Sequence, residues 1–142
     1  GSARSGKELR RHFFDNLPSF RTLRDKVTRA AGRGYLKGLD GRKIFVRHEH
    51  AALNTLLQGA GALVMKQALV LYDQGLSCKA TKLDAAFVAN VHDEWQLEAH
   101  ESCAKEVGEL GVACIRKAGE VFELACPLDG EYKIGDNWSE TH

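Results

Sequence analysis

Apolar positions recur with helical spacing through residues 6–31. Leu9, Phe13 and Leu17 stand four residues apart, and further apolar residues continue the same stripe. Pro18 interrupts the segment, and proline inside a helix removes a hydrogen bond and clashes with the preceding turn. The pattern therefore predicts a helix that is kinked at this proline or broken there into two helices.

Two later segments also have helical patterns. Residues 50–74 form the most apolar one, and Gly75 suits its end. Gly59 and Gly61 weaken this helix, so we expect another element to pass close to its backbone at these positions. Residues 101–118 are amphipathic, with acids early and bases late, which suits the helix dipole.

Short segments between and after these helices have strand character. Residues 35–47 read as a β-hairpin, because Asp40-Gly41 is a strong turn signal between two short apolar runs. Four further segments are predicted as strands from their apolar or alternating patterns. They are residues 84–90, 95–99, 121–126 and 130–134.

Val91-His92-Asp93-Glu94 joins two of these strands and is the most informative stretch of the chain. A connection this tight predicts a hairpin whose tip presents His92, Asp93 and Glu94 together. Adjacent carboxylates repel each other, so their presence at a tip suggests that a cation or a ligand uses them. An ordinary polar turn is the alternative interpretation.

Composition indicates a domain that folds rather than stays disordered. The 142 residues are 44% hydrophobic and 27% charged, and no apolar run is long enough to span a membrane. We expect one domain over residues 1–142, with basic helices and a hairpin in 6–49 and the remaining elements in 50–142. The four cysteines lack CxxC spacing, so free thiols in a reducing, cytoplasmic compartment are expected.

Charge is distributed unevenly along the chain. Residues 1–50 contain 13 Lys and Arg against 5 Asp and Glu, whereas residues 51–142 contain 7 against 14. A basic half suggests a polyanionic partner. The alternative is that these arginines simply cover the solvated faces of long helices.

The order of three motifs resembles the C-terminal part of family A DNA polymerases, the bacterial polymerase I superfamily. Leu39-Asp40-Gly41-Arg42 is followed by Ala51-Ala52-Leu53-Asn54 and then by Val91-His92-Asp93-Glu94. Gly6-Lys7-Glu8-Leu9 before them and Gly135-Asp136-Asn137-Trp138 with the final His142 are similar to the replicative polymerases of short-tailed phages. The likeness extends over nearly the whole chain.

The resemblance implies roles for the hairpin tip. Asp93 would be a ligand of two Mg²⁺ ions in the polymerase palm, Glu94 a supporting acid, and His92 a neighbour of the primer terminus. Two-metal catalysis needs carboxylates to hold both ions. The ions activate the primer 3′-hydroxyl and neutralise the charge of the leaving pyrophosphate. The partners so implied are primer-template DNA and a dNTP, and for a phage protein the location would be the host cytoplasm.

The resemblance also implies contacts with nucleic acid. Asn54 and Gln58 share one helix face and would reach the minor groove, whose acceptors are similarly placed for every base pair. Arg42 and Lys43 would lie near the DNA backbone, and His50 stands where the bacterial branch has an arginine. The alternatives are a helix N-cap for Asn54 and a core position for Gln58.

Two parts of a polymerase have no counterpart in these residues. They are the second metal carboxylate of motif A and the fingers helix of motif B. We therefore expect a missing N-terminal polymerase portion as a partner, and no primer extension by this chain alone. A non-catalytic remnant of a palm that binds nucleic acid or protein is the alternative, and a small metal-dependent nuclease is a third possibility.

The expected fold class is α+β. A small antiparallel sheet, with the His92–Glu94 hairpin at its centre, should pack against the 50–74 and 101–118 helices. Without a further palm strand this sheet has an open edge, which predicts a possible homodimer through that edge.

Overall fold

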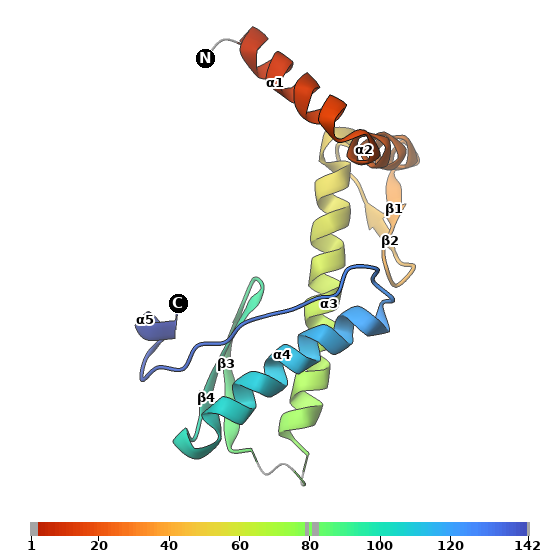
Figure 1. The fold of residues 1–142 in the computed structure, drawn as a ribbon. Helices are drawn as coiled ribbons and strands as arrows, with labels where there is room; N and C mark the ends of the chain where they lie inside the picture. Colours follow the sequence, from red (N-terminus) through yellow and green to blue (C-terminus); the bar gives the residue numbers. More distant parts are fainter. Residues whose placement is uncertain (1–2, 79, 81–82, 142) are drawn as a thin grey trace. The chain divides into compact units, whose positions relative to one another are not determined.

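The computed structural model describes residues 3–78, 80 and 83–141 (Figure 1). Its contacts group into two compact units, Gly1–Ala60 and Gly61–His142, and the division falls inside the long helix α3, Ala52–Leu76. The final His142 of the phage-like tail lies outside the described residues. None of the helices in the described part is long and apolar enough to cross a membrane.

The first unit begins with two helices in place of one long helix. α1 spans Ala3–Asn16 and α2 spans Pro18–Ala31, so the chain breaks at Leu17, as the sequence predicts. Pro18 is the first residue of α2, where its missing N–H has no helical acceptor to lose and its fixed φ already suits a helix.

A two-stranded hairpin follows α2. β1, Tyr35–Lys37, pairs antiparallel with β2, Lys43–Phe45, which confirms the predicted hairpin. Gly41 has a φ of +81°, a left-handed conformation that glycine adopts without steric cost. The Asp-Gly signal in the sequence therefore had a direct conformational cause.

The core of the first unit joins α2, the hairpin and the start of α3. Val27, Ala31, Leu36 and Ala52 are buried together. A short 3₁₀ helix, η1 (Glu49–Ala51), leads into α3. An added Cβ at Gly59 would lie 3.1 Å from Ile44 Cδ1, so the expected close approach is confirmed there.

The prediction that another element passes close to the backbone at Gly61 was wrong. An added Cβ at this glycine would have none of the described atoms within 4 Å. The two glycines look alike in the sequence, but only Gly59 has the hairpin beside it.

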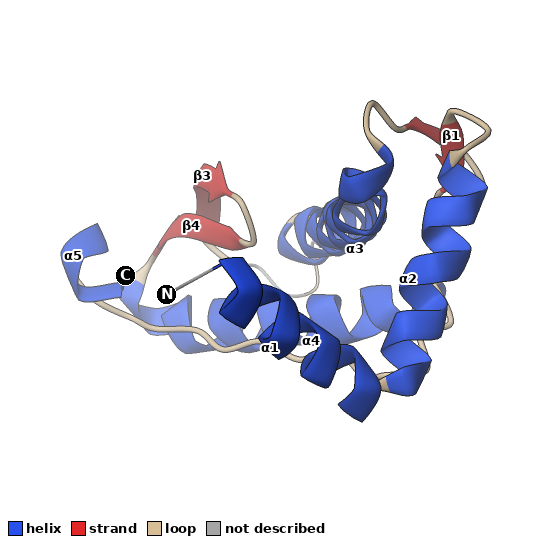
Figure 2. Ribbon diagram, turned by 90° about the horizontal axis from the view of Figure 1, so that it is seen from above, coloured by secondary structure: helices blue, strands red, loops and turns tan. Residues whose placement is uncertain are grey.

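The second unit contains the end of α3, a second hairpin and α4. β3, Ala85–Val91, pairs antiparallel with β4, Glu94–Ala99, and η2, Glu101–Cys103, leads into α4, Ala104–Val121. The last described helix is α5, Trp138–Thr141. Figure 2 shows strands only as these short pairs among longer helices, in keeping with the mixed fold class expected from the sequence.

The core of the second unit is aromatic. Tyr72 of α3 packs edge-on against Phe87 of β3, with ring centroids 5.3 Å apart, and lies 5.5 Å from Trp95 of β4. Val107 and Cys114 of α4 complete the buried cluster. The sheet therefore packs against both helices, as the sequence predicts.

The predictions of strands at residues 121–126 and 130–134 were wrong. The segment 121–126 begins with the last residue of α4 and continues as turns, and 130–134 forms no strand in the described structure. Phe122, Leu124 and Leu128 instead pack against the cluster around Val64 and Ala118. An apolar segment forms a strand only if another strand pairs with it. Here the apolar side chains pack against α3 and α4 instead.

Both sheets contain two strands, so each described strand has one edge without a strand partner. Unpaired edges can template association with another chain. Homodimerisation through such an edge stays a prediction, which gel filtration would test.

Candidate functional site

The tip of the β3–β4 hairpin is a two-residue turn. Val91 pairs with Glu94, which leaves His92 and Asp93 between the strands. His92 has a φ of +56°, and a positive φ at the first central residue is what the favoured two-residue turns require. Histidine is among the few non-glycine residues found relatively often in this region. The turn therefore fixes the backbone from which Asp93 projects.

Glu94 lies next to Asp93, in the residue pair that closes the turn, so the joint presentation of the three side chains stays a prediction. Glu94 is the first residue of β4, is half-buried, and accepts a hydrogen bond from Gln96 Nε2. The pairing register of the strands decides which residues remain in the turn, and here it leaves two. Four letters of sequence do not reveal that register.

Asp93 is exposed and makes no hydrogen bond or ion pair with another described residue. The same holds for His92 beside it. The described residues contain no group of three or more His, Cys, Asp or Glu placed to hold a metal ion. Asp93 is a hard oxygen donor of the kind that Mg²⁺ prefers, but one carboxylate does not form a complete magnesium site.

The base of this hairpin is held firmly. The Tyr72 hydroxyl donates a 2.7 Å hydrogen bond to the Val107 carbonyl oxygen and so joins α3 to α4 beneath the strands. Burial, and secondarily the nearby Cys114, raises the pKa of Tyr72 to about 12. Burial also raises the pKa of the Cys114 thiol. The exposed tip thus stands on a neutral, packed base.

Asn54 and Gln58 are both exposed in the first turns of α3. Their four-residue spacing places them on one face of the helix. α3 begins at Ala52, so Asn54 is inside the helix and is not its N-cap, and the exposure of Gln58 excludes a core position. Neither side-chain amide forms a hydrogen bond with another described residue, so both N–H groups can donate to a ligand.

The basic side chains near the first hairpin are partly engaged. Arg42 forms an ion pair with Asp40 across the turn. Desolvation opposes the shift, but hydrogen bonds from the Arg42 backbone N–H and guanidinium lower the pKa of Asp40 below its usual value. Lys43 Nζ lies 4.8 Å above the Tyr35 ring, and the exposed His50 stacks on His48. These groups keep N–H donors that face solvent.

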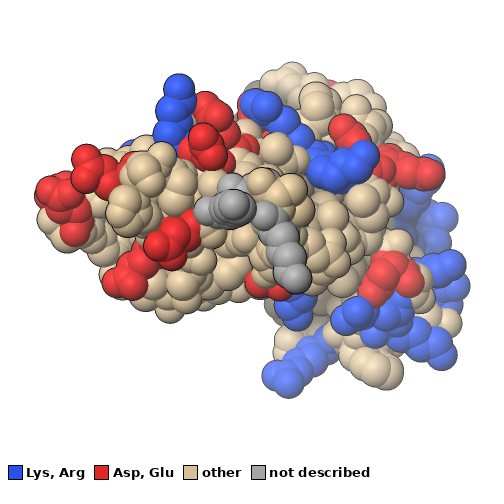
Figure 3. Space-filling model, turned by 90° about the horizontal axis from the view of Figure 1, so that it is seen from below, with Lys and Arg blue, Asp and Glu red and all other residues tan. Residues whose placement is uncertain are grey.

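The predicted site residues fall into both units. Asn54, Gln58, Arg42, Lys43 and His50 belong to the first, and the His92–Glu94 segment belongs to the second. Their charge environments differ, because the 13 basic residues of 1–50 all lie in the first unit, while the excess of acids lies in the second. Figure 3 shows Lys and Arg atoms gathered on one region of the surface and Asp and Glu atoms more numerous on another.

The structure adds one feature that the sequence analysis did not single out. The junction of α1 and α2 forms a small pocket that is lined mostly by basic side chains. The signal in the sequence was the pair Arg10-Arg11 before the proline and Arg21 and Arg24 after it. A helical pattern alone does not show that a break folds these two sets toward each other.

Comparison with known proteins places these features in a family. A family model described as DNA polymerase family A matches residues 2–140. This chain belongs to that family.

Named relatives agree with this assignment. The chain is 38% identical to a DNA-directed DNA polymerase of Escherichia phage Phieco32, over 100% of this chain and 24% of the relative. It is 40% identical to that of Enterobacteria phage T3, over 96% of this chain and 22% of the relative. DNA polymerase I of Aquifex aeolicus is 32% identical, over 98% of this chain and 24% of the relative.

A solved structure agrees as well. The POL domain of Pol1 from M. smegmatis, in complex with DNA primer-template and dNTP, superposes with a TM-score of 0.73 at 26% identity. The match covers 82% of this chain and 23% of that one. The chain therefore spans about a quarter of the length of the polymerases that it resembles.

Proposed function

We propose that this chain forms part of the palm of a template-directed DNA polymerase, and that Asp93 is one ligand of its catalytic Mg²⁺ pair. The observation that supports this most is an exposed carboxylate without a partner, fixed at the tip of a firmly anchored hairpin in a family A chain.

The metal ions would supply charge neutralisation for nucleotidyl transfer. The described residues alone do not fit a complete two-metal site, since they bring no second carboxylate into a cluster with Asp93. Further ligands, and the residues that bind the incoming nucleotide, would come from polymerase segments outside this chain. In this proposal His92 lies beside the primer terminus, and Glu94 supports the turn through Gln96.

The first unit would contact the DNA. Asn54 and Gln58 offer amide donors on one exposed face, which suits the minor-groove acceptors that every base pair shares. Arg42, Lys43 and His50 would contact the backbone phosphates, which favour such donors. These contacts would hold a primer-template without reading its sequence.

A chimera tests the catalytic part of the proposal. This chain replaces its matching segment in the phage T3 polymerase, and primer extension is measured with Mg²⁺ and dNTPs. We expect extension by the chimera, a loss of roughly 100-fold or more in Asp93→Asn, and little change in Asp40→Asn. The isolated chain should not extend a primer.

Three outcomes would contradict all or part of it. Asp93→Asn and wild-type chimeras with equal extension rates would remove the metal role. Extension by the isolated chain that is lost in Asp93→Asn would show that no further polymerase segment is needed. DNA binding that persists in Asp93→Asn, together with an inactive wild-type chimera, would instead favour a non-catalytic, nucleic-acid-binding role.

A second pair of variants tests the minor-groove contacts. Asn54→Ala with Gln58→Ala in the chimera should weaken primer-template binding to a similar extent for all terminal base pairs, because the groove acceptors are shared. Gln74→Ala, an exposed amide later in α3, is the matched control. Equal effects from both changes would show that the position of the amides does not matter.

A further inference from the structure

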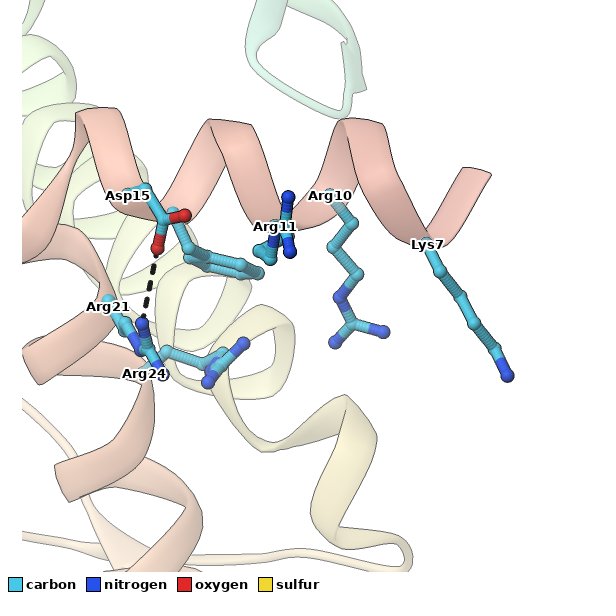
Figure 4. A pocket seen from close by; sticks show the side chains of 7 residues that line it. Lys7, Arg10, Arg11, Asp15, Arg21 and Arg24 are labelled. Atoms are coloured by element: carbon cyan, nitrogen blue, oxygen red, sulfur yellow. Dashed lines mark hydrogen bonds and ion pairs between the residues drawn. The ribbon is translucent and has the colours of Figure 1, made fainter. Parts of the chain in front are cut away.

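The junction between α1 and α2 holds a small pocket within the first unit. It is lined by Lys7, Arg10, Arg11, Phe14, Asp15, Arg21 and Arg24. Five of these side chains are positive and one is negative. Figure 4 shows them arising from the two helices, with Lys7 at the outer end.

Part of this positive charge is already balanced. Arg21 forms a 3.4 Å ion pair with Asp15, and Arg24 donates hydrogen bonds of 2.9 and 2.6 Å to Asp25. No carboxylate among the described residues pairs with Lys7, Arg10 or Arg11. These three cations face a shared concavity without a counter-ion from the chain.

An aromatic ring orients two of the guanidinium groups. The Arg24 guanidinium carbon lies 4.1 Å from the centre of the Phe14 ring, and that of Arg10 lies 5.7 Å from it. Phe14 is itself stacked on Phe20, with centroids 6.0 Å apart. Contact with a ring face limits the conformations of an arginine, so less entropy is lost when it binds an anion.

The chemistry of the pocket favours a phosphate. Its volume is about 210 Å³, which is enough for such an anion and below the range of roughly 300 to 1,000 Å³ that is typical for drug-sized ligands. A planar guanidinium matches two phosphate oxygens at once. Phe13, half-exposed and edge-on to Phe14 at 5.5 Å, offers a ring on which a neighbouring base can stack.

We propose that the α1–α2 pocket binds a backbone phosphate of single-stranded DNA, with Arg10 and Arg11 as its principal ligands and Phe13 as a stacking platform. The inference rests on the proposed polymerase function and adds a strand-binding site to it. The same pairing of cations with an exposed aromatic ring is how many proteins hold single strands without reading their sequence.

Fluorescence anisotropy of the purified chain with a labelled 20-nucleotide oligo-dT tests the proposal across a salt series. We expect Arg10→Gln/Arg11→Gln to weaken binding about tenfold and to lower the salt slope by about 0.7, since the two arginines share one phosphate and each phosphate contact on a single strand contributes about 0.7. Glutamine keeps a good helix propensity, and circular dichroism checks that α1 remains folded.

The control removes the same charge from elsewhere in the unit. Lys26→Gln/Arg29→Gln changes two exposed α2 residues that do not line the pocket and should alter affinity less than twofold. Equal losses in both double variants would overturn the proposal, because attraction would then depend on net charge alone. Phe13→Ala should weaken oligo-dT binding more than binding of a duplex of equal length, and equal losses on both would exclude stacking of a single strand.

Failure of this inference is distinguishable from failure of the proposed function. An active chimera with unchanged oligo-dT binding in Arg10→Gln/Arg11→Gln would overturn the phosphate pocket alone. An inactive chimera with the expected loss of oligo-dT binding would leave the pocket standing and remove the catalytic proposal.

Discussion

Both hairpins of this protein are antiparallel strand pairs with an aspartate at the tip, but the charge of that aspartate is balanced in only one of them. In β1–β2, Asp40 is neutralised by Arg42 within the turn, and a glycine provides the left-handed residue. In β3–β4, His92 provides that conformation, and Asp93 has no partner among the described residues. The carboxylate at the first tip is paired within the turn, whereas the carboxylate at the second tip faces solvent.

The hairpins also differ in how they are anchored. β1 buries Leu36 against α2 and α3, while Phe45 on β2 is 78% exposed. β3 and β4 instead place Phe87 and Trp95 around Tyr72, in a cluster that includes α4. A metal ligand needs a fixed position, and if Asp93 has the proposed role, the aromatic base supplies one. An unpartnered carboxylate on a rigid support is therefore a better functional candidate than the same residue type in a self-neutralised turn.

Removing an anchor should have the largest effect on stability. Trp95→Ala is expected to lower the free energy of unfolding by about 2 to 3 kcal/mol, because it leaves a cavity beside Tyr72. Phe45→Ala in the other hairpin should change it by less than about 0.5 kcal/mol. Urea unfolding followed by circular dichroism measures both, and losses of similar size would contradict the difference in anchoring.

Changing the left-handed residue at each tip should have a smaller effect. A Cβ in this conformation costs roughly 1 to 2 kcal/mol, so Gly41→Ala should destabilise its hairpin by about that amount. His92 already bears such a cost, but a β-branched residue is a stronger outlier at positive φ, so His92→Val should destabilise the β3–β4 hairpin further. His92→Gly should not. Amide hydrogen exchange within each hairpin reports the local change, and a His92→Gly variant as unstable as His92→Val would show that the histidine side chain, rather than its backbone, supports the turn.

The smallest expected effect concerns acid stability. The pKa of Asp40 is lowered from its usual value of 3.8 in the folded protein, so its contribution is present above that pH and is lost as the pH falls through the folded pKa. The β1–β2 hairpin should therefore weaken less steeply on acidification in Asp40→Asn than in the wild type. Amide chemical shifts of residues 38–43 measured from pH 6 to pH 2 test this.

Asp93→Asn is the matched control for that titration. It should leave the acid profile of the β1–β2 hairpin as in the wild type, since Asp93 belongs to the other unit. An identical profile for wild type and Asp40→Asn would contradict a stabilising role for the Asp40–Arg42 pair.

Much of the fold was predictable because its signals are local. The proline break, the Asp-Gly turn and the helical stripe of α3 each depend on residues close together in the chain. The motif order also predicted the family, which the match over residues 2–140 confirms. The roles of individual site residues stay predictions.

Other features needed contacts between distant residues. The apolar run at 121–126 looks like a strand, but it has no strand to pair with and covers the Val64–Ala118 cluster instead. The sequence places Glu94 in the same turn as Asp93, but Glu94 pairs with Val91 and is the first residue of β4. The basic pocket exists only because the break at Leu17 brings side chains of α1 and α2 together.

Where helices and turns form follows from residues close together in the chain, because propensity, turn chemistry and hydrophobic periodicity act over a few residues. Which turn pairs its own carboxylate, which glycine is approached closely and which arginines line one pocket are consequences of three-dimensional packing. Those outcomes depend on pairing register and on packing between segments far apart in the chain, and both are set by which surfaces exclude water together.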